Sequence, residues 1–245
     1  MKIICTYLIL FSSIAFSQYE HGTCIIVYLT KDTVFVGADN RTFIQDSGTH
    51  YYSVGTKCKI FRVDSTYFAF AGASRLMMSD SNSFSKYIAE KAISDANDLW
   101  NASRLFSMIY SDLLSGDTSY AMMLRDKPFQ ILFFGIHNSK AIISSLSFGD
   151  PNIFLQQNLD LISRIDYTVT QYPFYSVIGV SDSIKPFLES NKDYFLRLGK
   201  IQAIKNLIEL EHIKNPSDVN SNPNILYITF EGPTWIQRNV ECKTF

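Results

Sequence analysis

The 245-residue sequence predicts one α+β layered domain. Segments typical of strands occur in antiparallel pairs joined by short turns, and segments with helical periodicity fall into two blocks between those pairs. Hydrophobic residues make up 47% of the chain and charged residues 18%, as in an ordinary folded globular protein. A chain of this length builds one sizeable core, and no repeat, low-complexity tract or linker divides the sequence.

The first seventeen residues have the three-part pattern of a secretory signal peptide. Lys2 supplies the positive charge, Ile3–Phe11 a short, mostly apolar run, and Ala15–Ser17 the small residues before a cleavage site. The apolar run is shorter than the ~20 residues that span a bilayer. We therefore expect residues 1–17 to be removed and the mature protein to be periplasmic or secreted. A buried N-terminal strand or helix is the alternative.

The mature chain begins with segments whose composition is typical of β-strands. Four β-branched or aromatic segments are predicted to pair as two hairpins: Cys24–Leu29 with Thr33–Gly37, and Lys59–Val63 with Tyr67–Ala71. From Ser79 to Ser115, apolar residues recur mostly at spacings of three and four, which predicts two helices.

The second half of the chain repeats this alternation. We predict a hairpin, a strand, two helices and a last hairpin over the ranges Phe129–Phe134, Lys140–Leu146, Tyr175–Ile178, Ser183–Leu188, Leu196–Ile213, Ile225–Phe230 and Thr234–Gln237.

The open ends of the first two hairpins gather residues that can carry chemistry. A turn centred on Lys31 would place Thr23 opposite Asp39, with both side chains on one face. A turn centred on Ser65 would place Lys59 opposite Ala71, beside Gly72. We expect a site at these strand ends.

Short motifs around these positions resemble the opening of proteasome β-subunits and of the related bacterial HslV protease. Gly22–Val27 carries the Gly-Thr pair of that family, and Val36–Arg41 its small-small-Asp-x-Arg motif at the family's spacing of sixteen residues from threonine to aspartate. Lys59–Val63 is similar to the strand that bears the family's lysine, and Phe70–Gly72 to its glycine turn. The resemblance covers nearly the whole mature chain and implies a four-layer αββα sandwich of the N-terminal-nucleophile (Ntn) hydrolase type.

In that family the Gly-Thr bond cuts itself and leaves a threonine at the new N-terminus. By resemblance, residues 18–22 are a short propeptide and residues 23–245 a single Ntn-hydrolase domain. The expected activity is that of a threonine-type peptidase or amidase, activated by cleavage before Thr23, with a peptide or amide as substrate. Members of the family assemble, so a homo-oligomer is compatible with the resemblance, and ring formation stays open.

The residue types suit this chemistry. A threonine hydroxyl needs a base, and a free α-amino group with a pKa of ~7.7–8.0 accepts its proton. Lys59, kept charged by Asp39, would lower the pKa of the Thr23 amine and hydroxyl. The Gly72 N–H would donate to the oxyanion. The alternative is that the charged side chains are surface residues and Gly72 only a turn.

Three further roles come from the resemblance. Arg41 would form a structural ion pair, and Asp218 would orient the site. Phe70, two residues before the glycine turn, would form the floor of the pocket for the substrate side chain that precedes the cut. A ring there would leave room only for a small side chain such as Ala or Ser. Packing into the core is the alternative for Phe70.

The supporting motifs depart from the family. Val180 stands where the family has a serine that supports the amine, unless Ser181 takes that place, and both glycines after Asp218 are lost. Two other functions therefore stay open: a catalytically inactive proteasome-like scaffold or assembly subunit, and a small-molecule amidase on the same fold. Gly179–Ser183 also partly imitates the GxSxG elbow of serine hydrolases but lacks its last glycine.

Charge and cysteine usage exclude other classes. The net charge is −1 and no Lys/Arg cluster occurs, which argues against nucleic acid or a membrane surface as partner. Without a CxxC or HExxH motif we expect no metal and no cofactor. Cys24, Cys58 and Cys242 would remain after signal cleavage. This is an odd number, so their pairing stays open.

Overall fold

The computed structural model describes residues 19–21, 23–45, 51–72, 74–75, 84–116, 124, 128–149, 164–165, 172–239 and 242. The expected signal peptide lies outside these residues. Within them, no helix combines the length and the apolar character needed to cross a bilayer.

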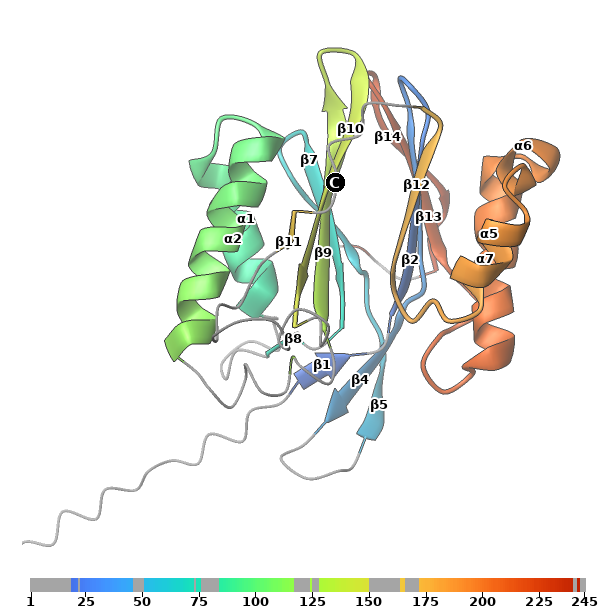
Figure 1. Ribbon diagram of the computed structural model, residues 1–245, viewed down its shortest axis with the longest axis horizontal. Helices are drawn as coiled ribbons and strands as arrows, with labels where there is room; N and C mark the ends of the chain where they lie inside the picture. The colour runs from blue at the N-terminus through green and yellow to red at the C-terminus, as the bar shows by residue number, and fades with distance from the viewer. Residues whose placement is uncertain are drawn as a thin grey trace, which may run out of the picture.

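Two five-stranded antiparallel sheets face each other (Figure 1). The first sheet has the order β12 (Phe174–Gly179), β2 (Cys24–Leu29), β3 (Val34–Ala38), β13 (Asn224–Thr229) and β14 (Gly232–Gln237). The second has the order β11 (Arg164–Ile165), β10 (Lys140–Phe148), β9 (Phe129–His137), β7 (Thr66–Ala71) and β6 (Ile60–Val63).

Helices cover the outer face of each sheet (Figure 1). The helices α1 (Phe84–Asp95) and α2 (Leu99–Gly116) pack on the second sheet. The helices α5 (Ile184–Ser190), α6 (Tyr194–Leu198) and α7 (Lys200–Lys214) pack on the first sheet. Antiparallel sheets combined with two blocks of helices confirm the mixed α+β class expected from the sequence.

Strand alternation divides the apolar residues among three cores. In β7, Phe68 and Phe70 point to the helices α1 and α2, while Ala69 and Ala71 point to the other sheet. All six residues of β2 are buried, because one face of this strand packs on the second sheet and the other on α7. This burial on both faces explains the continuously apolar sequence of β2.

A third, smaller sheet was not expected from the sequence. Its order is β5 (Tyr51–Thr56), β4 (Arg41–Gln45), β1 (Tyr19–His21) and β8 (Ser74–Arg75). Strand β1 pairs antiparallel with both β4 and β8. Residues expected in the propeptide thus form a strand between two others.

The expected hairpin registers are wrong by one residue. In the first hairpin Ile25 pairs with Ala38, so Cys24 rather than Thr23 lies level with Asp39, and the Asp39 N–H donates to the Cys24 carbonyl at 3.0 Å. The cause is a two-residue loop closed by a 2.9 Å hydrogen bond from the Thr30 N–H to the Thr33 carbonyl.

The second hairpin is also shifted by one residue, in the opposite direction. Val63 pairs with Thr66 across a two-residue turn in which Asp64 has a φ of +51°. Lys59 therefore lies just outside the ladder, before β6, rather than opposite Ala71.

One helical prediction is confirmed and another needs a new boundary. The two helices expected within 79–115 are α1 and α2. The helix expected over Leu196–Ile213 is two helices, α6 and α7, because Gly199 between them has a φ of +78°. Helical geometry requires a negative φ, so the helix is interrupted there.

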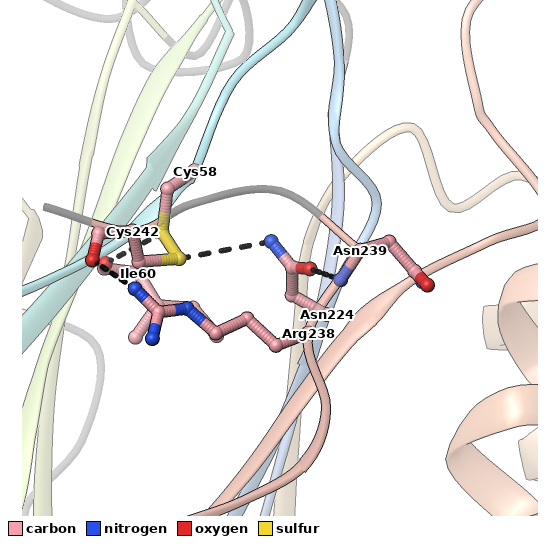
Figure 2. Close-up of a disulfide and its surroundings, with 6 residues drawn as sticks. All are labelled: Cys58, Ile60, Asn224, Arg238, Asn239 and Cys242. Atoms are coloured by element: carbon pink, nitrogen blue, oxygen red, sulfur yellow. Dashed lines mark hydrogen bonds between the residues drawn. A yellow bond between two sulfur atoms is a disulfide. The ribbon is translucent and has the colours of Figure 1, made fainter.

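A disulfide joins Cys58 and Cys242, which are 184 residues apart in the sequence (Figure 2). Cys24 is a free, buried thiol, and burial raises its pKa well above the ordinary value. The odd cysteine count is thereby explained within one chain.

Candidate functional site

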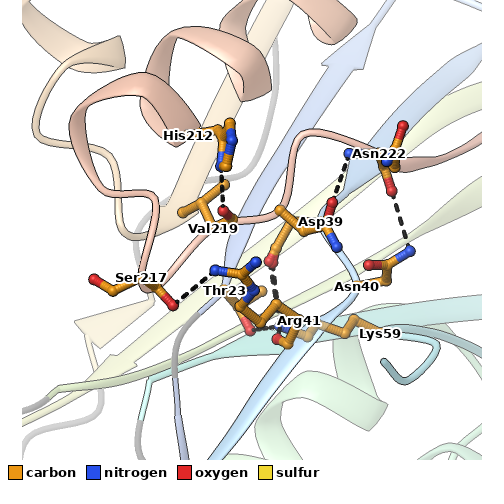
Figure 3. Close-up of polar contacts among 10 residues, drawn as sticks. Thr23, Asp39, Asn40, Arg41, Lys59, His212, Ser217, Val219 and Asn222 are labelled. Atoms are coloured by element: carbon orange, nitrogen blue, oxygen red, sulfur yellow. Dashed lines mark hydrogen bonds and ion pairs between the residues drawn. The ribbon is translucent and has the colours of Figure 1, made fainter. Parts of the chain in front are cut away.

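Three residues predicted for the site come together at one end of the facing sheets (Figure 3). Thr23 directly precedes β2, Asp39 directly follows β3, and Lys59 directly precedes β6. Antiparallel pairing puts the start of β2 beside the end of β3. The packing of the two sheets brings Lys59 to the same place.

The Lys59 ammonium connects the cluster. Its Nζ donates to Thr23 Oγ1 at 2.5 Å and lies 3.2 and 3.4 Å from the two carboxylate oxygens of Asp39. It also donates to the backbone carbonyl of Arg41. An ammonium has three N–H donors, so each proton has an acceptor, and this satisfies the condition for burying the charge.

Burial controls the electrostatics. Asp39 has no exposed surface, and Lys59 and Thr23 are 7% and 5% exposed. Burial raises the pKa of Asp39 from its ordinary 3.8 to about 6, although the nearby Lys59 charge opposes this rise. At neutral pH the carboxylate is therefore ionised and serves as the counter-ion of Lys59.

The Thr23 backbone is held by the end of β12. The Val180 N–H donates to the Thr23 carbonyl at 2.8 Å. Gly179 has a φ of +81°, and a Cβ at this position would lie 1.9 Å from the Thr23 carbonyl oxygen. Only glycine allows this close approach.

Gln130 connects the end of β12, at Gly179 and Val180, to the second sheet. Its Oε1 accepts a 2.9 Å hydrogen bond from the Gly179 N–H, and Gln130 itself pairs with Ala71 in the ladder between β7 and β9. Gln130 was not among the residues predicted for the site. One polar residue within the apolar run Phe129–Phe134 is the signal that could have identified it.

Gly72, the expected oxyanion donor, follows Ala71 at the end of β7. Its φ is +89°, and a Cβ there would lie 1.9 Å from the Pro128 carbonyl oxygen. A Cβ on Gly179 would lie 2.8 Å from the Ala71 Cβ. The chain leading into Gly72 therefore runs beside the loop that holds Thr23.

The two residues expected to support the site lie at its edge. The guanidinium of Arg41 donates to the backbone carbonyls of Pro216 and, at 3.1 Å, Ser217, and its charge lowers the pKa of Asp39 as a minor effect. Asp218 is on the same segment, where its carboxylate accepts a 3.2 Å hydrogen bond from the Ser217 hydroxyl. Arg41 therefore ties this segment, with Asp218, to the end of β3.

Phe70 lies on the helix-facing side of β7. Its ring stacks on Phe61 and contacts Phe129, with centroid distances of 5.4 and 5.9 Å, and it is 9% exposed. This position next to the turn at Gly72 is compatible with both readings of the sequence, a pocket floor and a core residue.

Ser181 and Glu211 fix the turn that follows β12. The Ser181 hydroxyl donates to the Gly179 carbonyl at 3.1 Å. The buried Glu211 carboxylate on α7 accepts from the N–H groups of Ser183 and Ile184 at 3.0 and 3.3 Å. Glu211 was not among the predicted residues either; a charge among the apolar positions of α7 is the signal that could have identified it.

A cavity of about 160 Å³ lies at the other end of the second sheet. The β6–β7 turn, the end of β9 and the α1–α2 connection line it. It is therefore separate from the Thr23 site. Among the described residues, no group of three His, Cys, Asp or Glu side chains is placed to hold a metal ion.

The fold matches solved structures of Anbu proteins. One is an Anbu (Gly-1) mutant from Hyphomicrobium sp. strain MC1, with a TM-score of 0.56 and 14% identity over 90% of this chain and 89% of that chain. Another is Anbu from Yersinia bercovieri, described as an ancestral beta-subunit, with a TM-score of 0.54 and 12% identity over 89% and 88%. No protein-family model and no curated protein sequence matches the chain.

These matches correct the family expected from the sequence. The similar structures are Anbu proteins, a proteasome-like but distinct family, so the assignment to proteasome β-subunits or HslV is wrong. At 12–14% identity the likeness shows the proteasome-like fold alone.

Proposed function

We propose that this chain is a threonine-type amide or peptide-bond hydrolase of the Ntn kind, activated by cleavage before Thr23. The observation that carries this proposal is the buried Lys59 ammonium, 2.5 Å from Thr23 Oγ1 and paired with Asp39. The succession of helices, sheet, sheet and helices supports a four-layer αββα assignment.

These contacts support the following catalytic cycle. Once residues up to Gly22 are removed, the free Thr23 amine accepts the hydroxyl proton, directly or through a water. The Thr23 oxygen attacks the amide carbonyl, and the oxyanion accepts a hydrogen bond from the Gly72 N–H. Collapse expels the leaving amine, which takes the proton back from the Thr23 ammonium, and leaves an acyl ester on Thr23. Water, deprotonated by the Thr23 amine, then hydrolyses this ester, releases the acyl group as a carboxylic acid and restores the hydroxyl.

Lys59 lowers the barrier by its charge. A positive group in contact with Thr23 Oγ1 lowers the pKa of the hydroxyl and of the nearby amine. The amine then stays neutral and able to accept a proton at neutral pH. Asp39 keeps Lys59 protonated, and the loop at Gly179 and Val180 fixes the backbone of the nucleophile.

The proposed maturation includes export, loss of residues 1–17 and then loss of the propeptide 18–22, leaving the domain 23–245. The Cys58–Cys242 disulfide supports export, because disulfides persist mainly in oxidising compartments. A homo-oligomer is part of the proposal, since one of the similar structures is described as a subunit.

A substrate panel tests the activity. We expect purified protein with an N-terminal Thr23 to hydrolyse peptides or acyl amides, and Thr23→Ala to lose this hydrolysis. A processed wild type that cleaves nothing in the panel would point to a scaffold. Cleavage of acyl amides alone would point to a small-molecule amidase.

Phe70 is proposed to set the preference for the residue preceding the cut. The wild type should prefer Ala or Ser at that position, because the ring fills the space beside Phe61 and Phe129. Phe70→Ala should shift the preference towards large side chains, at a stability cost of about 3–5 kcal/mol for the cavity. Peptide sets that differ only at this position measure the shift. An aromatic preference of the wild type, or an unchanged preference in the variant, would assign Phe70 to the core alone.

A further inference from the structure

We propose that the Cys58–Cys242 disulfide is a positioning element for Lys59, so that a dithiol reductant switches the site off. The inference rests on the proposed function for its catalytic consequence. The placement of Lys59 by the disulfide does not depend on any activity.

The segment that carries Lys59 lies outside the strand ladders. Strand β5 ends at Thr56 and β6 begins at Ile60, so residues 57–59 form a connection between two different sheets. The Lys57 N–H donates to the Asn40 carbonyl at 2.8 Å. Cys58 follows directly, and its covalent bond to Cys242 is the second attachment of this short connection.

The other end of the disulfide is anchored beside Asp39. The carbonyl of Cys242 accepts a 2.6 Å hydrogen bond from Arg238 Nη2, and its sulfur accepts a weak contact of 3.8 Å from Asn224 Nδ2 (Figure 2). Asn224 is buried and pairs with Ala38, the residue before Asp39. Asn224 Oδ1 also accepts from the Asn239 N–H at 2.8 Å, which holds the chain leading to Cys242.

The disulfide therefore links the segment that carries Lys59 to the segment next to its ion-pair partner, Asp39. One half-cystine is adjacent in sequence to Lys59, and the other is fixed to the strand that pairs with the residue before Asp39. Breaking this strap removes the covalent attachment of the connection at Cys58 to the segment that contains Cys242. The Lys59 ammonium then loses its fixed distance to Thr23 Oγ1, and a misplacement of ~1 Å can cost about 100-fold in rate.

The reductive step is ordinary thiol–disulfide exchange. A dithiol such as dithiothreitol attacks as a thiolate at the sulfur of Cys58, which is partly exposed, whereas Cys242 is 1% exposed. The Cys242 thiolate leaves, and the second thiol of the reagent then displaces Cys58. The protein gains two thiols, and the reagent ends as its own cyclic disulfide.

Lysine acetylation of the folded protein tests the placement of Lys59 without any substrate. Oxidised and dithiothreitol-reduced proteins are treated with the succinimidyl ester of acetic acid, and mass spectrometry reports each lysine. We expect Lys59 to be protected when oxidised and to react several-fold faster when reduced. Lys86 and Lys91, in ion pairs on α1, are the controls and should not change. In the double variant Cys58→Ser/Cys242→Ser, Lys59 should react as fast as in reduced wild type, and the reductant should not change this rate.

Hydrolysis provides the catalytic readout. Reduction should lower kcat by about 100-fold with little change in KM, because nucleophile activation is lost while the rest of the fold stays in place. Unchanged Lys59 acetylation on reduction would overturn the proposal. So would cooperative loss of far-ultraviolet circular dichroism, since the disulfide would then stabilise the whole domain. If the oxidised protein hydrolyses no substrate, the proposed function fails, and the acetylation result alone decides whether the strap positions Lys59.

Discussion

Lys59 makes three contacts from one buried nitrogen, to Thr23 Oγ1, to Asp39 and to the Arg41 carbonyl. A compact ammonium on a flexible stem can point three protons at three acceptors in different directions. A planar guanidinium cannot, and it is larger. The geometry therefore requires lysine itself and not merely a positive charge.

Lys59→Arg should abolish most hydrolysis, by about 100-fold or more, because the larger group displaces the contact with Thr23 Oγ1. Steady-state kinetics measure the loss, and circular dichroism should show a folded domain. Lys31→Arg, at an exposed turn position, is the matched control and should keep full activity. A fully active Lys59→Arg protein would remove Lys59 from the mechanism.

Asp39 should cause the hydrolytic activity to fall at acidic pH. Its pKa of about 6 lies above the ordinary 3.8, so kcat/KM should fall as the pH drops through about 6 and the counter-ion of Lys59 is neutralised. A raised pKa means that the folded state binds this proton more tightly than the unfolded state. The Asp39 contribution to stability is thus fully present below 3.8 and is lost as the pH rises through about 6.

Acid inactivation near pH 6 should therefore precede any unfolding that Asp39 causes. A pH series of kcat/KM with parallel circular dichroism measures both properties. A midpoint near pH 4, or loss of structure together with activity, would contradict the role given to buried Asp39.

At the scale of elements, the end of β12 determines where the nucleophile sits. Gly179 approaches the Thr23 carbonyl, Val180 donates to it, and Gln130 holds the Gly179 N–H from the neighbouring sheet. The loop thus joins the two sheets at Thr23, the residue before β2.

Gly179→Ala should disturb this junction, because its Cβ would lie 1.9 Å from the Thr23 carbonyl oxygen. Gly199→Ala is the matched control: its φ of +78° is similar, but a Cβ there meets nothing within 4 Å. Both variants bear the backbone cost of about 1–3 kcal/mol. Only Gly179→Ala should also lose hydrolysis, as measured by activity at equal folded fraction. Equal activity in the two variants would show that the close approach at Gly179 is not required.

The sequence predicted the paired elements better than their registers. Apolar runs such as Cys24–Leu29 identify strands because both faces are buried, and Thr23, Asp39 and Lys59 follow from strand ends. Turn length decides register, and the hydrogen bond between Thr30 and Thr33 that fixes it cannot be read from residue types. The short, mixed polar strand β4 gives no clear periodicity and so escaped prediction.

At the scale of the whole molecule, contacts between segments that are distant in the sequence could not be predicted. Cysteine pairing across 184 residues has no local signal, and the same holds for Gln130, whose partner is on the other sheet. The motif residues Thr23, Asp39 and Lys59 do lie together, but the family that the motif indicated is wrong, since the similar folds are Anbu proteins. Short motifs indicate which residue types lie at a site, whereas a fold comparison covers the arrangement of the whole chain.

The N-terminus of the mature protein tests the central claim most directly. Intact mass and N-terminal sequencing of the purified wild type should show a chain that starts at Thr23, because hydrolysis requires the free amine. Thr23→Ala, which lacks the nucleophile, should instead retain Gln18–Gly22. A wild type and a Thr23→Ala variant that start at the same residue would contradict a self-activated threonine hydrolase.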